Sequence, residues 1–156
     1  VLEDVIIDFT EGDQGWSLFT FSHTGQPNIS GGSYVPGAGW RRPGTSPGYL
    51  SIHKDMYIPG VLGVEVDYTT GSQSSLAIRF QCGIEIGHDT TNSQGHTTTT
   101  GKTWRASPGA NSSGGYVALT EVVPDVVPQV VDHMWIKVSA NGSGTTTIRR
   151  IKFVRS

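Results

Sequence analysis

Hydrophobic and polar residues alternate along most of this chain with a period of two, which is the spacing of side chains on the two faces of a β-strand. Clusters of Gly, Pro, Ser and Asn separate the alternating stretches and predict turns between them. The clearest alternating stretches are residues 5–9, 50–52, 62–68, 76–82, 117–119 and 134–138. Because no repeat, linker or amphipathic helical pattern interrupts the series, the sequence predicts one all-β domain over residues 1–156, built as an antiparallel β-sandwich.

Two of the longer stretches carry charged and amide side chains opposite their apolar face. The apolar face of residues 62–68 is predicted to consist of Leu62, Val64, Val66 and Tyr68. Glu65 and Asp67 then lie on the opposite face of that strand. In residues 76–82, Arg79 and Gln81 alternate with apolar residues in the same way. Such polar positions favour either a solvated outer surface or a polar, concave sheet face that binds a ligand.

Three other segments depart from simple alternation. Ile148 is out of phase with the apolar residues that follow it, which predicts a β-bulge near Arg149 and Arg150. Two prolines in residues 121–133 argue against a helix interior or a central strand, so this segment is predicted to be an extended crossover. Residues 87–101 are polar throughout and predict a long loop or hairpin tip.

Charge and composition exclude several classes of protein. The formal net charge is −2, and no run of Lys or Arg is longer than two residues, which argues against a nucleic-acid partner. No apolar stretch approaches the length of a membrane span. The single cysteine, Cys82, excludes an internal disulfide and a cysteine-based metal cluster. The chain begins at Val1, so we expect it to be a processed or excised part of a larger polypeptide.

The four tryptophans fall into two pairs. Trp16 follows a glycine turn and Trp135 opens a late strand, and both are predicted to belong to the core or its edge. Trp40 and Trp104 lie in polar sequence and are each followed by arginine. An indole ring can cover the C–H face of a sugar while nearby polar side chains bind its hydroxyl groups. The alternatives are that Trp40 folds over the end of the sandwich and that Trp104 is a half-buried strand residue.

Three segments resemble parts of jelly-roll carbohydrate-binding modules. IDFTEGDQGWS (7–17) is similar to their first hairpin, PGYLSI (47–52) to a later strand, and WIKVSANGSGTTTIRRIKF (135–153) to their closing hairpin. The resemblance implies a jelly-roll topology and non-catalytic binding of a polysaccharide or oligosaccharide. Similar modules are appended to secreted polysaccharide-degrading enzymes or inserted into phage tail proteins, which implies an extracellular or cell-surface location. The first and last strands are expected to pair, as suits an inserted domain.

The same resemblance raises the question of a structural calcium ion. Such modules often hold calcium between acidic residues of the first strand region and an Asp on the last strand. Here Asp8 and Glu11 are candidate ligands near the first strand, but the last strand carries Arg149, Arg150 and Lys152 instead of an acid. A calcium site needs about six to eight oxygen ligands. The sequence therefore leaves calcium open and implies no other cofactor.

The predicted sugar site combines aromatic rings with hydrogen-bonding side chains. Its central residues are Trp40, Arg42, Arg79, Gln81 and Trp104, and its further hydrogen-bonding residues are Tyr49, Glu65 and Asp67. The arginines would also suit an anionic sugar. The prediction requires that Trp40 lie at the rim of the polar sheet face with an exposed indole surface. The alternative function is a structural or protein-interaction sandwich of a phage tail or surface protein, whose exposed aromatics would contact another protein.

Catalysis is not expected from this sequence. Glu65-Val66-Asp67 resembles half of the acidic motif of jelly-roll β-glucanases, but the third acid of that motif is missing from residues 68–71. Glycoside cleavage needs two suitably placed carboxylates. Cys82 alternates with core residues, and no Gly-x-Ser-x-Gly sequence is present to position a nucleophilic serine. A glycoside hydrolase is thus the least favoured of the three functions.

Overall fold

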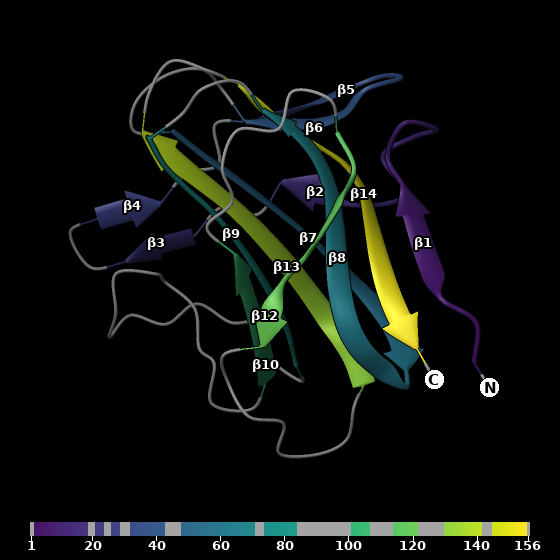
Figure 1. Ribbon diagram of the computed structural model, residues 1–156. Helices are drawn as coiled ribbons and strands as arrows, with labels where there is room; N and C mark the ends of the chain where they lie inside the picture. Colours follow the sequence, from purple (N-terminus) through teal and green to yellow (C-terminus); the bar gives the residue numbers. More distant parts are fainter. Residues whose placement is uncertain are drawn as a thin grey trace.

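The structure is a computed structural model that describes residues 2–18, 21–23, 26–28, 32–42, 48–70, 74–83, 101–106, 114–121, 130–141 and 145–155. For some strand residues, among them Tyr49, Arg79, Gln81 and Trp135, it describes the backbone alone. Across these ranges the chain forms fourteen strands (Figure 1): β1 (Val5–Asp8), β2 (Ser17–Leu18), β3 (Phe21–His23), β4 (Gln26–Asn28), β5 (Ser33–Val35), β6 (Gly39–Arg42), β7 (Gly48–Pro59), β8 (Val61–Thr70), β9 (Ser74–Gly83), β10 (Gly101–Ala106), β11 (Tyr116–Ala118), β12 (Thr120–Glu121), β13 (Val130–Asn141) and β14 (Thr146–Arg155).

The strands form two six-stranded antiparallel sheets and a separate β3–β4 hairpin. The β8 sheet has the order β11-β8-β14-β6-β5, with β1 also paired to β14. The β9 sheet has the order β12-β10-β9-β13-β7-β2. The chain crosses between the sheets from β7 to β8, from β8 to β9 and again from β13 to β14, as it does in a jelly roll (Figure 1). The predicted all-β, antiparallel sandwich is confirmed.

The hydrophobic core lies between the two sheets. Phe80 of β9 contacts Phe153 of β14 with ring centroids 5.5 Å apart, so the inner faces of the sheets meet directly. Other buried side chains from both sheets include Leu50, Ile52, Val64, Val66, Tyr68, Ile78, Ile136, Val138 and Ile151. These residues follow the period of two in the sequence, because each strand buries one face and turns the other outward.

Irregularities in pairing shift two strands out of simple alternation. Leu62 was predicted to face the core, and this is wrong: Leu62 is 53% exposed, whereas Val61 is 1% exposed. The register against β14 changes between Val154 and Arg155, so Leu62 is an extra residue on β8. The bulge predicted near Arg149 is confirmed, since the register also shifts between Ile148 and Arg150.

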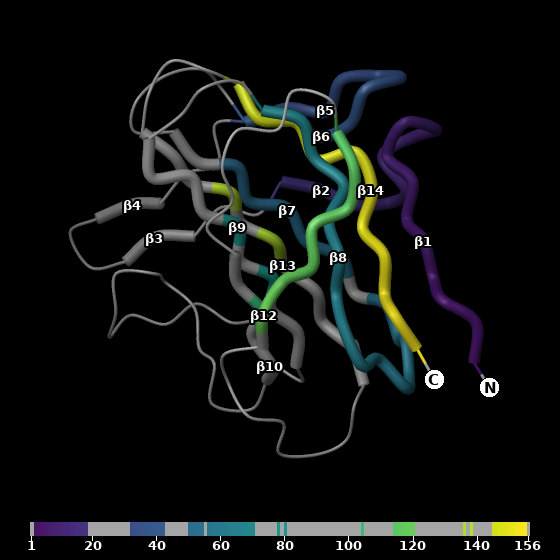
Figure 2. Tube along the Cα trace, in the orientation of Figure 1, coloured from purple at the N-terminus to yellow at the C-terminus, as the bar shows by residue number. Residues whose placement is uncertain are grey.

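The first and last strands lie side by side, as predicted. β1 pairs with the second half of β14, from Val5 opposite Phe153 to Asp8 opposite Arg150 (Figure 2). β6 pairs with the first half of the same edge of β14. Most of the predicted loop 87–101 and of the predicted crossover 121–133 lies outside the described residues. Within the described residues, no helix is long and apolar enough to cross a membrane.

Candidate functional site

The sandwich divides the predicted site residues between its two outer faces. Glu65 and Asp67 belong to β8, and their neighbours in sequence face the core, so both lie on the outer face of the β8 sheet. Positions 79 and 81 belong to β9, where the buried residues Ile78 and Phe80 alternate with them. Strand geometry therefore assigns Arg79 and Gln81 to the outer face of the β9 sheet. The two pairs lie on opposite sides of the protein and do not form one site.

Trp40 is buried, which contradicts the predicted exposed indole. It is 5% exposed and lies on β6 opposite Ile148 of β14, where both side chains face the core. Its ring meets that of Tyr34 edge-on, with centroids 5.4 Å apart, and the Tyr34 hydroxyl donates a hydrogen bond of 2.7 Å to the Phe9 carbonyl. Its indole nitrogen is buried without a hydrogen-bond partner among the described residues. Trp40 is a core residue and cannot stack on a sugar in this conformation.

Trp104 and Arg42 are buried as well. Trp104 is 2% exposed and lies opposite Phe80, with the two ring centroids 5.8 Å apart. Arg42 is fully buried on β6 opposite Thr146, and burial lowers the pKa of its guanidinium group. The exposed arginine of this strand is Arg41, because alternation turns it outward. The central aromatic part of the predicted site is therefore wrong: these side chains build the interior.

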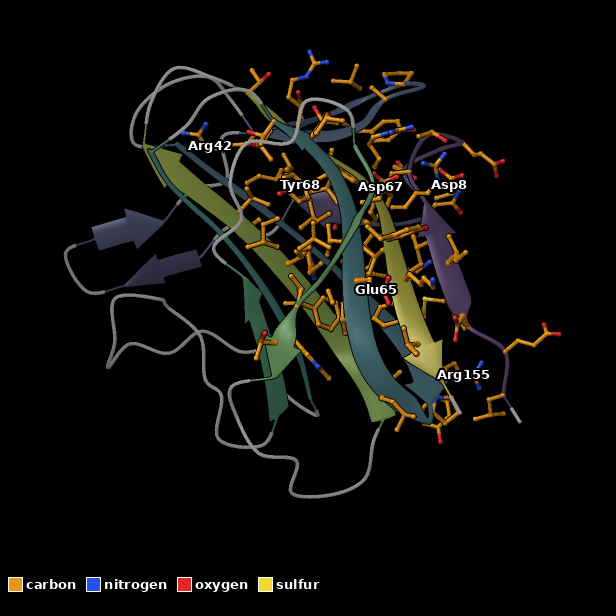
Figure 3. The ribbon with its side chains drawn as sticks, viewed as in Figure 1. Asp8, Arg42, Glu65, Asp67, Tyr68 and Arg155 are labelled. Atoms are coloured by element: carbon orange, nitrogen blue, oxygen red, sulfur yellow. The ribbon has the colours of Figure 1, made fainter. Side chains whose placement is uncertain are left out.

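The outer face of the β8 sheet carries a row of four cross-strand neighbours: Tyr116, Asp67, Arg150 and Asp8. Asp67 is buried although it points away from the core (Figure 3). Its carboxylate accepts hydrogen bonds from Arg150 at 2.7 Å and from the Gly115 backbone N–H at 3.0 Å. Arg149 adds an ion pair at 3.9 Å. The carboxylate of Asp67 is thus engaged by groups of the protein itself.

Asp8 and Glu11 do not fit a calcium site. One Asp8 oxygen accepts hydrogen bonds from the Thr10 backbone N–H and hydroxyl at 2.9 and 2.6 Å, and the other pairs with Arg150 Nε at 3.2 Å. Desolvation raises the pKa of Asp8, but the Thr10 hydrogen bonds and Arg150 together hold it below its ordinary value. Glu11 is exposed, and the described residues contain no group of three or more His, Cys, Asp or Glu side chains suited to a metal. The Arg150 guanidinium pairs with both the Asp8 and the Asp67 carboxylates and so takes the place of a cation between them.

A second row on this face consists of Ala118, Glu65, Lys152 and Ile6. Lys152 pairs with Glu65 at 3.9 Å and lies 5.1 Å from the centre of the half-exposed Tyr116 ring. Burial, together with the carboxylates of Asp67, Asp8 and Glu65, outweighs the effect of Arg150 and raises the pKa of Tyr116. The Asp8, Asp67 and Glu65 carboxylates on the outer face of the β8 sheet are therefore paired with basic side chains of the protein itself.

The outer face of the β9 sheet combines an aromatic position with polar ones. One cross-strand row contains Thr103, Gln81, Trp135, His53 and Ser17. The next row contains Arg105, Arg79, Lys137 and Ser51. Tyr49 occupies the same face opposite Ser139. His53 is half-buried, and its Nε2 lies 3.2 Å from the Ser17 hydroxyl.

Of the predicted site residues, the backbone register assigns Arg79, Gln81 and Tyr49 to this face, and the prediction did not include the other positions on it. Trp135 was predicted to be a core-edge residue, and its side chain, like those of Arg79, Gln81 and Tyr49, lies outside the described part of the chain. The backbone register nevertheless assigns position 135 to the face opposite the buried Ile136. In the sequence, Trp135 and Lys137 alternate with the apolar residues Met134, Ile136 and Val138, and this pattern could have indicated that both face outward.

No protein-family model matches this sequence, and no curated protein matches it either. Among solved structures, the carbohydrate recognition domain of Emp47p is 8% identical with a TM-score of 0.52, covering 97% of this chain and 94% of that one. A family two carbohydrate esterase from Cellvibrio japonicus is 8% identical with a TM-score of 0.50. That likeness covers 99% of this chain, which spans only 34% of the esterase chain.

A third solved structure is the family 11 carbohydrate-binding module of Lic26A-Cel5E from Clostridium thermocellum, which is 16% identical with a TM-score of 0.49 and covers 100% of this chain and 96% of that one. At such low identities, the likenesses to Emp47p and to the esterase define the fold alone. The chain is an antiparallel β-sandwich similar in fold to carbohydrate-recognition domains.

Proposed function

We propose that this protein binds a glycan on the outer face of its β9 sheet without cleaving it. The observation that carries the proposal is the cross-strand row in which position 135 lies between positions 81 and 53. A tryptophan at the centre of a sheet can cover the C–H face of a sugar ring, while an amide and an imidazole on either side hydrogen-bond to its hydroxyls. The similar Emp47p domain is described as a carbohydrate recognition domain, which supports the same role here.

The proposed binding residues are Trp135, Gln81, Arg79, His53 and Tyr49. Adjacent strands lie about 4.8 Å apart, so the three positions of the central row span about 10 Å. The buried residues Trp40, Trp104 and Arg42 are not part of this surface. Glu65 and Asp67 are also left out, because they belong to the other sheet.

The expected affinity is modest. One ring covering about 70 Å² of apolar sugar surface contributes about 2 kcal/mol at 25 cal/mol per Å². A few hydrogen bonds added to this give dissociation constants of roughly micromolar to millimolar after the cost of association. Such a domain is effective when a larger polypeptide supplies several contacts to one polymer. We therefore propose that it directs a larger secreted or cell-surface protein to a polysaccharide.

The ion pairs on the β8 sheet support the absence of catalysis. The Asp67 carboxylate is hydrogen-bonded to Arg150 and Gly115, and Glu65 pairs with Lys152. Asp67 is buried and engaged in this arrangement, so it does not offer the second free carboxylate that glycoside cleavage needs beside Glu65. Prolonged incubation with β-glucans and detection of new reducing ends tests this part. Sustained turnover that Glu65→Gln abolishes would overturn it.

The binding proposal is tested by a glycan array followed by calorimetric titration of the ligands that it identifies. Trp135→Ala and Gln81→Ala are each expected to weaken binding at least tenfold. Tyr116→Ala is the matched control, because Tyr116 is an aromatic residue 38% exposed on the outer face of the other sheet. Circular dichroism of each variant verifies folding. Trp135→Phe keeps an aromatic ring at this position, so it separates an effect of losing the indole from an effect of losing the ring that packs on the sheet.

Two outcomes would overturn the proposal. In the first, the wild-type protein binds no glycan and instead docks to another protein through its exposed aromatic residues. In the second, Tyr116→Ala weakens glycan binding as much as Trp135→Ala, which would move the site to the β8 sheet.

A further inference from the structure

Three basic residues are direct cross-strand neighbours on the outer face of the β9 sheet. Arg79 of β9 lies opposite Arg105 of β10 on one side and opposite Lys137 of β13 on the other. With about 4.8 Å between adjacent strands, the three backbone positions lie within about 10 Å of one another. Like charges at directly opposite positions destabilise a sheet. Such a row is therefore unfavourable unless other groups balance its charges.

Among the described positions, the outer-face rows directly beside this basic row, defined as Arg105, Arg79 and Lys137, contain no acidic residue. On β7, β9, β10 and β13 these rows contain Thr103, Gln81, Trp135, His53, Ala77, Ser139 and Tyr49. On β12, Thr120 lies opposite Arg105, and the adjacent Glu121 lies opposite the buried Trp104, in the inward-facing row. Asp55 is the nearest acid on this face of β7, four residues from Ser51, and lies opposite His133. At 3.3 Å per residue, four residues correspond to about 13 Å.

On the outer face of the β8 sheet, by contrast, acidic residues lie beside the basic ones. There Arg150 pairs with Asp8 and Asp67 at 3.2 and 2.7 Å, and Lys152 pairs with Glu65 at 3.9 Å. Arg150 and Lys152 of the β8 sheet thus pair with acids on adjacent strands, whereas the described outer-face positions beside the basic row of the β9 sheet carry none. A partner that carries negative charge would remove the repulsion within the row.

We propose that the glycan bound on the β9 sheet is anionic and that the basic row binds its negative groups. This inference rests on the proposed function and names the ligand class. Arg79 is two residues from Gln81 on the same strand face, so one anionic sugar residue can contact both positions. Arginine binds carboxylate, sulfate and phosphate groups through paired hydrogen bonds, and the flanking Lys137 adds a third positive charge. The negative group is a carboxylate of a uronic acid or a sulfate or phosphate ester.

The test compares polymers that share a backbone and differ in charge. Polygalacturonate and its fully methyl-esterified form test the carboxylate, and dextran sulfate and dextran test the ester-linked anion. The wild-type protein is expected to bind at least one charged form tenfold or more tightly than its neutral counterpart. Its affinity for that form should fall as sodium chloride rises, because salt screens the charges.

Charge-removing variants locate the effect. Arg79→Gln and Lys137→Gln are each expected to weaken binding of the charged polymer at least fivefold and to leave the thermal midpoint unchanged or higher, because repulsion within the row is relieved. Lys152→Gln removes the same charge from the opposite face and is expected to leave the affinity unchanged. Equal loss in Lys152→Gln and Lys137→Gln would reduce the effect to net charge and overturn the inference.

The outcomes also separate this inference from the proposed function. Binding that depends on Trp135 but is equally tight for charged and neutral polymers overturns the anionic ligand alone. Binding to none of the polymers, combined with an empty glycan array, overturns both. Preference for the carboxylate polymer or for the sulfated one supports the inference and identifies the type of anion.

Discussion

The substitution Asp67→Asn tests whether the buried carboxylate on the β8 sheet contributes to stability. The Asp67 side chain is 5% exposed and that of Arg150 is 27% exposed. Asparagine keeps the shape and can still accept the hydrogen bond from the Gly115 N–H. It removes the negative charge and turns the short contact with Arg150 Nη1, now 2.7 Å, into one between an uncharged amide and a guanidinium.

The expected loss follows from the environment of the pair. A hydrogen bond to a charged group contributes about 1.5–3 kcal/mol, and breaking a fully buried ion pair costs about 3–5 kcal/mol. Arg150 is partly solvated and keeps its contact with Asp8, so the lower part of this range applies. We expect Asp67→Asn to lower the free energy of unfolding by about 2–3 kcal/mol. In a domain of this size that corresponds to a fall of about 4–12 °C in the thermal midpoint.

Glu65→Gln on the same strand is the matched control. Its pair with Lys152 is 3.9 Å long, and both side chains are 28% exposed. Such a surface pair contributes less than about 1 kcal/mol. Urea denaturation and thermal melts of both variants, monitored by tryptophan fluorescence, give the comparison. If Asp67→Asn costs no more than Glu65→Gln, the argument that burial strengthens the Asp67–Arg150 pair is refuted.

Four further experiments test the core position of Trp40, the turn at Gly39, the contribution of Asp8 to stability and the absence of a calcium effect. Trp40→Ala should lower the free energy of unfolding by about 3–5 kcal/mol but leave the glycan affinity of the folded protein unchanged, and a selective loss of affinity would contradict its place in the core. Gly39→Ala should cost more than about 1 kcal/mol in urea denaturation, because φ is +135° and a Cβ would overlap the Ile148 carbonyl oxygen; Gly37→Ala, with φ at +78° and no atom within 4 Å, should cost less. The pKa of Asp8 is held below its ordinary value of 3.8, so its contribution is present above about pH 4 and is lost as pH falls through the folded value; acid unfolding should be less steep in Asp8→Asn. Calcium and a chelator should leave the thermal midpoint unchanged, and a calcium-dependent rise would contradict the role given to Arg150.

The proposed surface could be predicted from the sequence only in part. Alternation correctly separated Arg79 and Gln81 from Ile78 and Phe80, because that information is carried by adjacent residues of one strand. It could not tell that Glu65 and Asp67 belong to the opposite sheet, because sheet membership depends on pairing between distant segments. Alternation also placed Trp135 and Lys137 opposite the apolar face of their strand, but only strand pairing brings them beside Gln81 and Arg79.

The glycine-rich stretch around Trp40 gave a misleading signal. The polar residues beside Trp40 suggested an exposed indole, but Gly37 belongs to the turn and Arg41 and Arg42 to the second strand of the β5–β6 hairpin. Gly37 has a φ of +78° and Gly39 one of +135°, so the glycines serve the turn, and pairing with β14 then directs Trp40 inward. Arg42, two residues from Trp40, is itself fully buried, so the polarity of neighbouring residues did not indicate exposure of the indole.

The sequence alone determined the all-β class, the faces of most strands, the bulge near Arg149 and the pairing of the first and last strands. The class, the strand faces and the bulge follow from the local period of two and from the position where it breaks, whereas the pairing of the first and last strands was expected from the resemblance to jelly-roll modules. Tertiary structure decided that Trp40 and Trp104 are buried, that Asp67 is covered by a segment 48 residues away, and that the basic row forms from three separate strands. These features depend on which strands become neighbours, and strand partnership is set by packing of the whole sandwich.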